Sequence, residues 1–455
     1  MKPACKRLLP LLLLAVLSVT QFCFSDPAVV YYDPGMTHAV TGLNRYPNGK
    51  KDWNFNFNIS PFHQHASGAR DKDGKKVPIG DRLGRWEILG IFWDDNKVAD
   101  NTAPAAPADK PFNADNYEYF YSLSVHLYEK YGVTPSGDEG ALDKTADYSV
   151  DIEYEKIGVR SELDFEMAGG FGLTVKGGLV EYKQTPTFTN KSPATSDAMF
   201  DLFITRSLMA HEVGRQGLIE KDLGLSLARY ETMVFEDTFA QLYWSNPYKL
   251  DDEHGNHTVT VAPYLSAGLW IPTGKKKNQN AAFSLPSGHD GFWGLSFKGA
   301  INFDFPGTVL VNIGGGATFF ETKTLSGQRV PNHESQRSIY PWKARIRKTY
   351  GPGIDFNFSL RSENIMDYLS VYFDYIYAKH EKDTITMQEV DSSRNSYFIP
   401  SMLEEDSFWK SQMVQLGFQY QITPDLAFGA CGQTHISGVK VFKTHTIMGT
   451  ITFAF

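Results

Sequence analysis

The chain has 455 residues, 14% of them aromatic, and a formal net charge of −8 with 44 basic and 52 acidic residues. This acidic balance excludes the basic surplus by which proteins bind nucleic acid, and no nucleic-acid-binding motif is present in the sequence. A disulfide framework is excluded as well, because two of the three cysteines, Cys5 and Cys23, lie in a segment that we expect to be removed.

The N-terminal segment has the pattern of a secretory signal peptide. Its basic start consists of Lys2, Lys6 and Arg7. The apolar run that follows, 8–19, is shorter than the about 20 residues of a membrane-spanning helix, which argues against an anchor. Small residues at Cys23 and Ser25 predict cleavage before Asp26. We therefore predict a signal peptide over 1–25 and export of the remainder.

The mature domain, 26–455, alternates apolar and polar residues in many short segments, as strands with two unlike faces do. Candidate strands cover 51–60, 86–94, 117–129, 148–167, 171–183, 234–245, 258–272, 291–305, 309–321, 340–361, 367–380, 410–422, 426–435 and 439–455. Turns rich in Gly, Pro or Asp join several of them, at 168–170, 306–308 and 423–425. On both sides of each turn, the apolar residues fall at positions of the same parity, odd or even. A three-residue hairpin loop requires this, because it pairs residues that are four positions apart. Between Tyr154 and Val159 the apolar residues change from even to odd positions, which predicts a bulge near Lys156.

One candidate strand carries a ladder of charges. Gly351 to Gly353 could form a hairpin inside 340–361, but a hairpin there would put the polar segments 322–339 and 381–409 on opposite sides of a membrane, so we favour one long strand. The candidate pore-lining residues of its polar face are Lys343, Arg345, Arg347, Asp355, Asn357 and Arg361, and Ser359 lies on the same face. Three cations within about 14 Å would bias a pore toward anions. The alternative is that they are solvated above the membrane or paired with acids.

Residues 196–233 differ from the rest, because their apolar residues recur at helical spacing and strand alternation is weak. This predicts one or two helices inserted in a long loop. The insertion could fold inward as a constriction or plug, cap the mouth, or lie on the surface.

The last strand carries the most specific pattern. Its apolar face consists of Ile447, Ile451, Phe453 and Phe455. It resembles the C-terminal strand of Gram-negative outer-membrane β-barrels, in which a terminal Phe and alternate apolar residues are read during insertion. The resemblance implies an all-β, antiparallel transmembrane barrel of 14 strands, or 12 if 86–94 and 117–129 lie outside the wall. It also implies contact with outer-membrane lipids and with the barrel-assembly machinery.

Catalytic and metal-binding patterns are weak. Ser287, His289 and Asp290 suggest an outer-membrane lipid hydrolase, but they lie in a Gly- and Pro-rich turn and adjacency alone does not make a relay. His63 and His65 have a spacing that suits one metal, without an evident third ligand. We expect no cofactor and no enzyme. The predicted function is a passive channel for small hydrophilic solutes, with a plugged structural or adhesive barrel, or the hydrolase, as alternatives.

Overall fold

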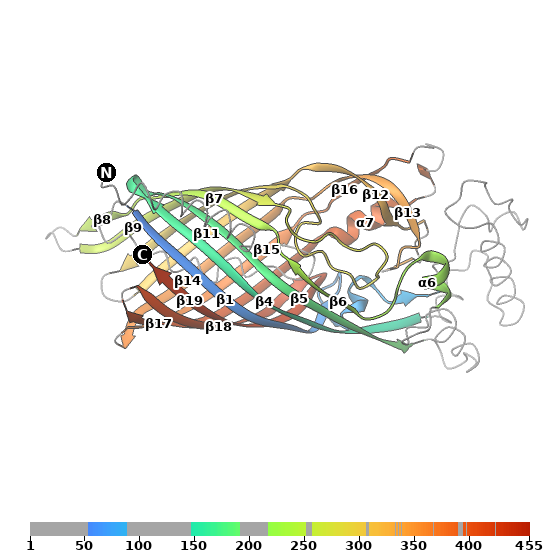
Figure 1. Cartoon of the computed structure of the whole chain (residues 1–455), viewed down its shortest axis with the longest axis horizontal. Coiled ribbons are helices and arrows are strands. Elements are labelled where there is room, and N and C mark those ends of the chain that lie inside the picture. The colour runs from blue at the N-terminus through green and yellow to red at the C-terminus, as the bar shows by residue number, and fades with distance from the viewer. Residues whose placement is uncertain are drawn as a thin grey trace, which may run out of the picture.

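The computed structural model is a closed antiparallel β-barrel (Figure 1). It describes residues 53–88, 147–191, 217–251 and 257–455, apart from 306–308, 333, 335, 338, 367, 390–394, 397 and 424. The predicted signal peptide, the candidate strand 117–129 and the turn 306–308 lie outside the described residues. Among the residues that are described, no helix is long and apolar enough to cross a membrane.

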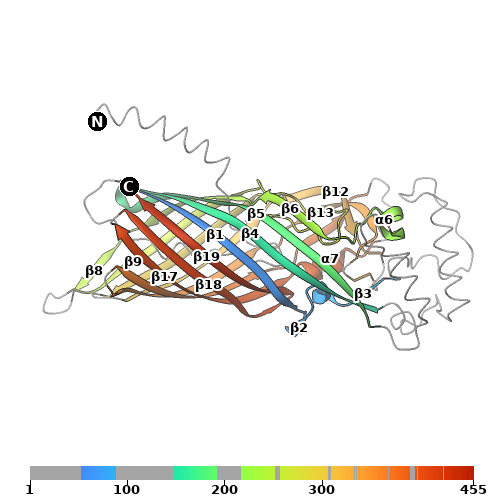
Figure 2. The ribbon, with the colours of Figure 1, turned by 60° about the horizontal axis from the view of Figure 1, so that its bottom comes forward.

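Twelve of the described strands form the wall. They are β1 (Trp53–Arg70), β4 (Asp147–Met167), β5 (Phe171–Asn190), β7 (Thr238–Ser245), β9 (His257–Ile271), β10 (Gly294–Phe305), β11 (Val309–Phe320), β14 (Gly353–Met366), β15 (Leu369–His380), β17 (Trp409–Thr423), β18 (Leu426–Val439) and β19 (Val441–Ala454). Each pairs with its neighbours in this order, and β1 closes the sheet between β4 and β19 (Figure 2). The wall therefore confirms the alternative of twelve strands and not the fourteen that we preferred.

Short elements extend the wall or cover one end of it. Single wall strands are extended by β2 (Lys76–Val77), β3 (Trp86–Glu87), β6 (Tyr230–Phe235) and β8 (Tyr248–Asp251). A separate sheet consists of β12 (Thr322–Val330), β13 (Trp342–Thr349) and β16 (Thr384–Met387). The helical elements are η2 (Gly80–Leu83), η4 (Ala168–Gly170), α6 (Leu218–Leu223) and α7 (Pro400–Ser407). Of the predicted strand 86–94, only β3 is a described strand, and it pairs with the first two residues of β4.

The barrel has two unlike ends (Figures 1 and 2). We call the end that holds the C-terminus and the 168–170 turn the terminal end. The opposite end is covered by the cap, which we define as the described residues of 76–88, 217–229, 272–293, 321–352 and 381–408.

The predicted single strand over 340–361 is wrong. Its first part is β13, which belongs to the separate sheet, and only β14 lies in the wall. The break is at Gly351, where an added Cβ would lie 2.0 Å from the carbonyl oxygen of Glu381 and where the amide N–H bonds Asp383 instead of a strand neighbour. Both 322–339 and 381–409 still lie at the cap end, as expected, because β13 returns the chain to the wall.

The predicted bulge near Lys156 is also wrong, because β4 pairs with β5 and with β1 in unbroken register across it. The apolar residues change from even to odd positions because the inner and outer faces of β4 exchange their polarity along the strand. Toward the terminal end, Ile157 and Val159 point outward and are 48% and 46% exposed, while Lys156 points inward and is buried. Toward the cap end, the outward residues are polar and exposed, such as Asp151, and the inward ones are apolar and buried, such as Ile152.

The position of this reversal marks one edge of an apolar band around the outside of the barrel. On β4 the band runs from Ile157 to Met167. At about 3.3 Å per residue and a tilt of about 40°, the ten steps between these residues rise about 25 Å, which matches the about 25 Å apolar band of transmembrane barrels. Other wall strands contribute exposed Leu269, Leu295, Phe297, Ile313, Phe356, Leu416, Phe418 and Ile447.

Candidate functional site: the lumen and its cap

The inner face of the wall is polar within the apolar band. A buried cluster joins Arg160 and Lys156 of β4 to Glu236, which lies between β6 and β7. Arg160 Nε and Nη2 donate to the Glu236 carboxylate at 2.9 and 3.0 Å, and Lys156 Nζ lies 3.0 Å from it. Two cations therefore share one carboxylate inside the barrel. A buried charge is tolerated in this way because its partners replace the lost water.

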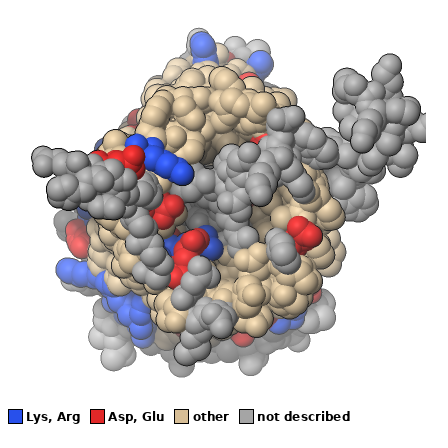
Figure 3. Space-filling view, turned by 90° about the vertical axis from the view of Figure 1, so that its left-hand side faces the viewer, with Lys and Arg blue, Asp and Glu red and all other residues tan. Residues whose placement is uncertain are grey.

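Closer to the terminal end, side chains of opposite charge pair on the inner face. Lys176 Nζ lies 2.8 Å from Glu162, and Lys298 Nζ lies 3.7 Å from Asp355. Viewed from this end, several acidic and basic side chains lie inside the ring formed by the wall (Figure 3). The lumen is thus charged but close to balance in its described part, which matches the mixed charge of many pores.

Three of the predicted pore-lining residues lie on this inner face, on β14. Asn357 donates to Asn312, which in turn donates to Asn302, so that amides on three neighbouring strands form one ladder with distances of 2.7 and 2.5 Å. Arg361 donates to Gln419 at 3.0 Å. Asp355 is the partner of Lys298 described above.

The other three predicted residues, Lys343, Arg345 and Arg347, are placed elsewhere. All three lie on β13, in the separate sheet of the cap, and their side chains are exposed. The buried face of β13 instead holds Ala344 and Ile346, which pack against β12 and β16. The charge ladder therefore does not line the barrel wall, because the strand that carries it leaves the wall sheet.

An apolar core joins the cap to the outer part of the wall. From the cap it includes Ile79, Trp86, Ile219, Leu223, Leu225, Leu227, Phe283 and Ile339, and from the wall Val150, Ile152, Tyr154 and Phe442. Part of the predicted helical insertion 196–233 therefore contributes α6 and the following residues to this core, whereas 230–233 form strand β6. The rest of the insertion, 192–216, lies outside the described residues.

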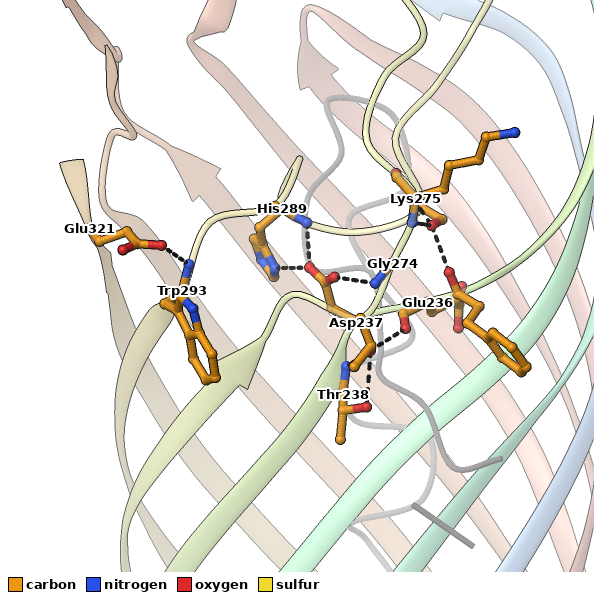
Figure 4. A network of polar contacts seen from close by, with 12 residues as sticks. Glu236, Asp237, Thr238, Gly274, Lys275, His289, Trp293 and Glu321 are labelled. Atoms are coloured by element: carbon orange, nitrogen blue, oxygen red, sulfur yellow. Dashed lines mark hydrogen bonds and ion pairs between the residues drawn. The ribbon is translucent and has the colours of Figure 1, made fainter. Parts of the chain in front are cut away.

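One polar contact ties the cap segment 272–293 to the wall (Figure 4). Asp237, directly before β7, accepts from His289 Nδ1 at 2.9 Å and from the backbone N–H groups of His289 and Gly274. Both side chains are buried, and the imidazole lies between the rings of Trp270 and Phe320. We call the pair of Asp237 and His289 the first latch.

The first latch does not form a hydrolase site. Ser287 Oγ donates to the carbonyl oxygen of Phe235 at 2.6 Å and accepts from the Lys275 amide, so it is engaged with backbone rather than with His289. Among the described residues, His289 Nε2 has no hydrogen-bond partner and is buried. Asp290, the third predicted member, accepts from the Lys277 amide.

A second latch lies further around the wall. Asp383 is 3.0 Å from His380 Nε2 at the end of β15, 2.8 Å from Lys348 Nζ of β13, and accepts from the Gly351 amide at 2.8 Å. Asp383 and His380 are almost fully buried. This carboxylate therefore joins the separate sheet of the cap to the wall.

Aromatic rings form an arc between the two latches, at the level where the lumen meets the cap. Ring centroids 4.4 to 6.0 Å apart connect, in order, Phe239, Trp270, His289, Phe320, Tyr350, His380 and Trp409. Such edge and offset contacts add to the burial of the rings. The arc separates the charged lumen from the cap over the wall strands from β7 to β17.

His63 and His65 lie on β1 and not in a loop. Both are exposed on the outer face beyond the apolar band, where His63 Nε2 is 3.0 Å from Glu155 and the His65 ring stacks on His445. No group of three or more metal-ligating side chains was found within the described part of the chain.

Sequence reasoning missed the residues that close the lumen. Glu236 and Asp237 are two acids inside the predicted strand 234–245, and their placement between β6 and β7 was the available signal. Their partners are distant in sequence, with Asp237 and His289 separated by 52 positions.

No protein-family model matches the chain, and no curated protein matches its sequence. Solved structures of similar shape include the COG4313 outer membrane channel from Pseudomonas putida F1, with 9% identity, a TM-score of 0.45 and coverage of 90% of this chain and 100% of that one. The translocator domain of the autotransporter NalP from Neisseria meningitidis has 8% identity, a TM-score of 0.34 and coverage of 91% of each chain. OmpF from Salmonella typhi has 8% identity, a TM-score of 0.23 and coverage of 89% and 97%.

Proposed function

We propose that this chain is an outer-membrane channel for small hydrophilic solutes, exported by a signal peptide over residues 1–25. The observation that carries the proposal is the reversal of polarity on β4, where lipid-type residues outside and charged residues inside coincide over one membrane thickness. A closed sheet satisfies all its backbone hydrogen bonds, as a lipid-embedded structure must.

The terminal end faces the periplasm in this proposal, and the cap faces the outside. Short turns such as 168–170 are typical of the periplasmic side of such barrels, and longer segments of the outer side. The C-terminal strand supplies the insertion signal for the barrel-assembly machinery, through Ile447, Ile451, Phe453 and Phe455. Two of these, Ile447 and Phe455, are 71% and 62% exposed on the outer face.

Transport would be passive, and the polar inner face would select solutes by size and charge. Passage depends on opening of the cap, since its apolar core and the two latches close over the lumen. The same core favours the second candidate, a plugged structural or adhesive barrel. The two differ in one property, which is whether ions cross.

Single-channel recording tests this proposal. Residues 26–455 would be purified in detergent, shown to be folded by heat-modifiable mobility, and reconstituted in a planar bilayer. Stepwise conductance supports the channel, and a folded barrel without conductance supports the plugged barrel. Lipid hydrolysis by the wild-type protein that is lost in His289→Ala would instead support the hydrolase hypothesis.

A further inference from the structure

A cavity of about 200 Å³ lies between the cap and the outer part of the wall. Its apolar walls come from Ile79, Trp86, Leu225, Phe283, Ile339 and Phe442, and the rings of Trp86 and Phe283 are stacked with centroids 5.4 Å apart. A cavity of about 150 Å³ accommodates benzene when its lining is apolar. This volume therefore suits one small molecule with a flat or compact apolar body.

Charged residues also line the cavity, and cations outnumber acids. Among the described lining residues, the cations are Arg82, Lys277, Arg329 and Lys348, and the acids are Asp290 and Asp406. Lys348 is bound to Asp383, and Arg329 donates only to carbonyl oxygens of the backbone, including those of Pro341 and Leu223. The positive charge of Arg329 is therefore not neutralised by a carboxylate within the described residues.

Lys277 is the lining cation that is available to bind a ligand. Its side chain is exposed, and it is one of the residues that line the cavity. Its backbone N–H donates to Asp290, but its ammonium has no ion pair with any residue that the structure describes. An ammonium that lines a cavity without an ion partner has N–H donors available to an anion.

The electrostatics point the same way. Burial lowers the pKa of the Lys277 ammonium, Asp290 opposes this, and Arg82 and Lys348 lower the pKa further. The acid beside it is already surrounded by cations, since Lys348 and Lys277 both act on Asp290. An incoming anion thus meets unbalanced positive charge, whereas an incoming cation would meet repulsion.

We propose that the cavity binds a small monocarboxylate whose apolar body packs against the apolar lining that includes Trp86 and Phe283 and whose carboxylate accepts a hydrogen bond from Lys277 Nζ. Lys277 then recognises the charge of the ligand, and the apolar lining recognises its shape. Small-molecule sites combine affinity with orientation in this way. The inference deepens the proposed channel, on which its physiological meaning rests, by naming the class of solute that the cap admits.

Binding of benzoate to residues 26–455 in a non-ionic detergent tests the site by calorimetry. Benzamide is the neutral isostere, and benzylamine the cationic one. Benzoate should bind at least tenfold more tightly than either. Lys277→Met, which keeps the length of the side chain and removes its charge, should weaken benzoate binding at least tenfold, whereas Lys277→Arg should retain most of it.

Lys275→Met is the matched control, because it removes a cation from the same segment whose Nζ donates to Thr232 and does not line the cavity. Heat-modifiable mobility verifies that each variant folds. Equal affinity for benzamide, equal effects of the two Met variants, or no benzoate binding to the folded protein would each overturn the inference. Conductance of the same preparation is a separate readout: a conducting barrel that ignores benzoate overturns the site alone, and a silent barrel that binds it overturns the channel alone.

Discussion

His289 Nδ1 lies 2.9 Å from Asp237 Oδ2, and neither side chain is more than 1% exposed. The carboxylate also accepts two backbone N–H groups, from His289 and Gly274, so a single side chain fixes both ends of a cap segment. The cap is therefore fastened to the wall at a buried point from which water is excluded.

Replacing Asp237 by Ala should release this segment. The change leaves buried donors on His289 and Gly274 unsatisfied, and each such donor costs about 1–3 kcal/mol. We expect cleavage within 272–293 by added protease and a lower unfolding midpoint in urea. Asp151→Ala, which removes an exposed acid from β4, should change neither. Unaltered proteolysis of Asp237→Ala would show that the segment is held by other contacts.

The second latch should make the cap sensitive to acid. Burial alone would raise the pKa of Asp383, but Lys348 and the hydrogen bond with His380 outweigh it and hold the pKa well below its ordinary value of 3.8. A depressed pKa stabilises the folded state fully above about pH 4, and this stabilisation is lost as pH falls below 3.8 toward the folded value.

We therefore expect the free energy of unfolding to fall more steeply between pH 4 and pH 2 in the wild type than in Asp383→Asn. Asp290 and Asp406 have raised pKa values, mainly through burial, and act with the opposite sign. They are the same in both proteins, so the difference between the two urea titrations isolates Asp383. Parallel curves would refute the assignment.

The reversal on β4 can be mapped by single cysteines in a Cys431→Ser background. Val159→Cys and Phe356→Cys should react with a lipid-soluble maleimide and resist a water-soluble one, because both wild-type side chains face outward in the apolar band. Glu153→Cys also faces outward but lies beyond the band, so the water-soluble reagent should label it. Water-phase labelling at Val159 would place the membrane boundary elsewhere.

Ion selectivity should depend on the inner cluster rather than on the ladder of β13. Glu236→Gln leaves Arg160 and Lys156 without their shared carboxylate, which should shift the reversal potential toward anions. Breaking a buried pair costs about 3–5 kcal/mol, so folding of Glu236→Gln is verified by heat-modifiable mobility. The double variant Lys156→Met with Glu236→Gln has the net charge of the wild-type cluster and should leave the reversal potential nearly unchanged.

The matched control neutralises the exposed cations of β13 together, at Lys343, Arg345 and Arg347. Because they lie outside the wall sheet, their removal should leave the reversal potential nearly unchanged. A loss of anion preference in this variant, together with an unchanged reversal potential in Glu236→Gln, would return the charge ladder to the conduction path.

Much of the wall was predictable because lipid and water impose a period of two on every strand that separates them. The last strand and the pairs of strands around 168–170 and 423–425 follow this rule and were placed correctly. The β13 segment has the same period although it packs against a cap rather than lipid. Alternation alone cannot identify which apolar surface a strand faces, so 340–361 was joined into one strand.

The site was less predictable, because its contacts are tertiary. Asn357 and Asp355 follow from parity on one strand, whereas Glu236 meets Arg160 only after β5 and β6 bring β7 into position. The parity break on β4 was visible in the sequence. Its cause was a change of surroundings along an unbroken strand, and a bulge was the local explanation.

The polarity reversal also constrains how this molecule can be assembled. In an isolated β4 strand, Ile152 and Lys156 would share one face, so neither an all-lipid nor an all-water environment could satisfy that face. Only a closed wall with its cap seated offers charge partners to Lys156 and apolar partners to Ile152 together. Barrel closure and cap docking should therefore occur as a single cooperative event. An incomplete wall is stable neither in lipid nor in water.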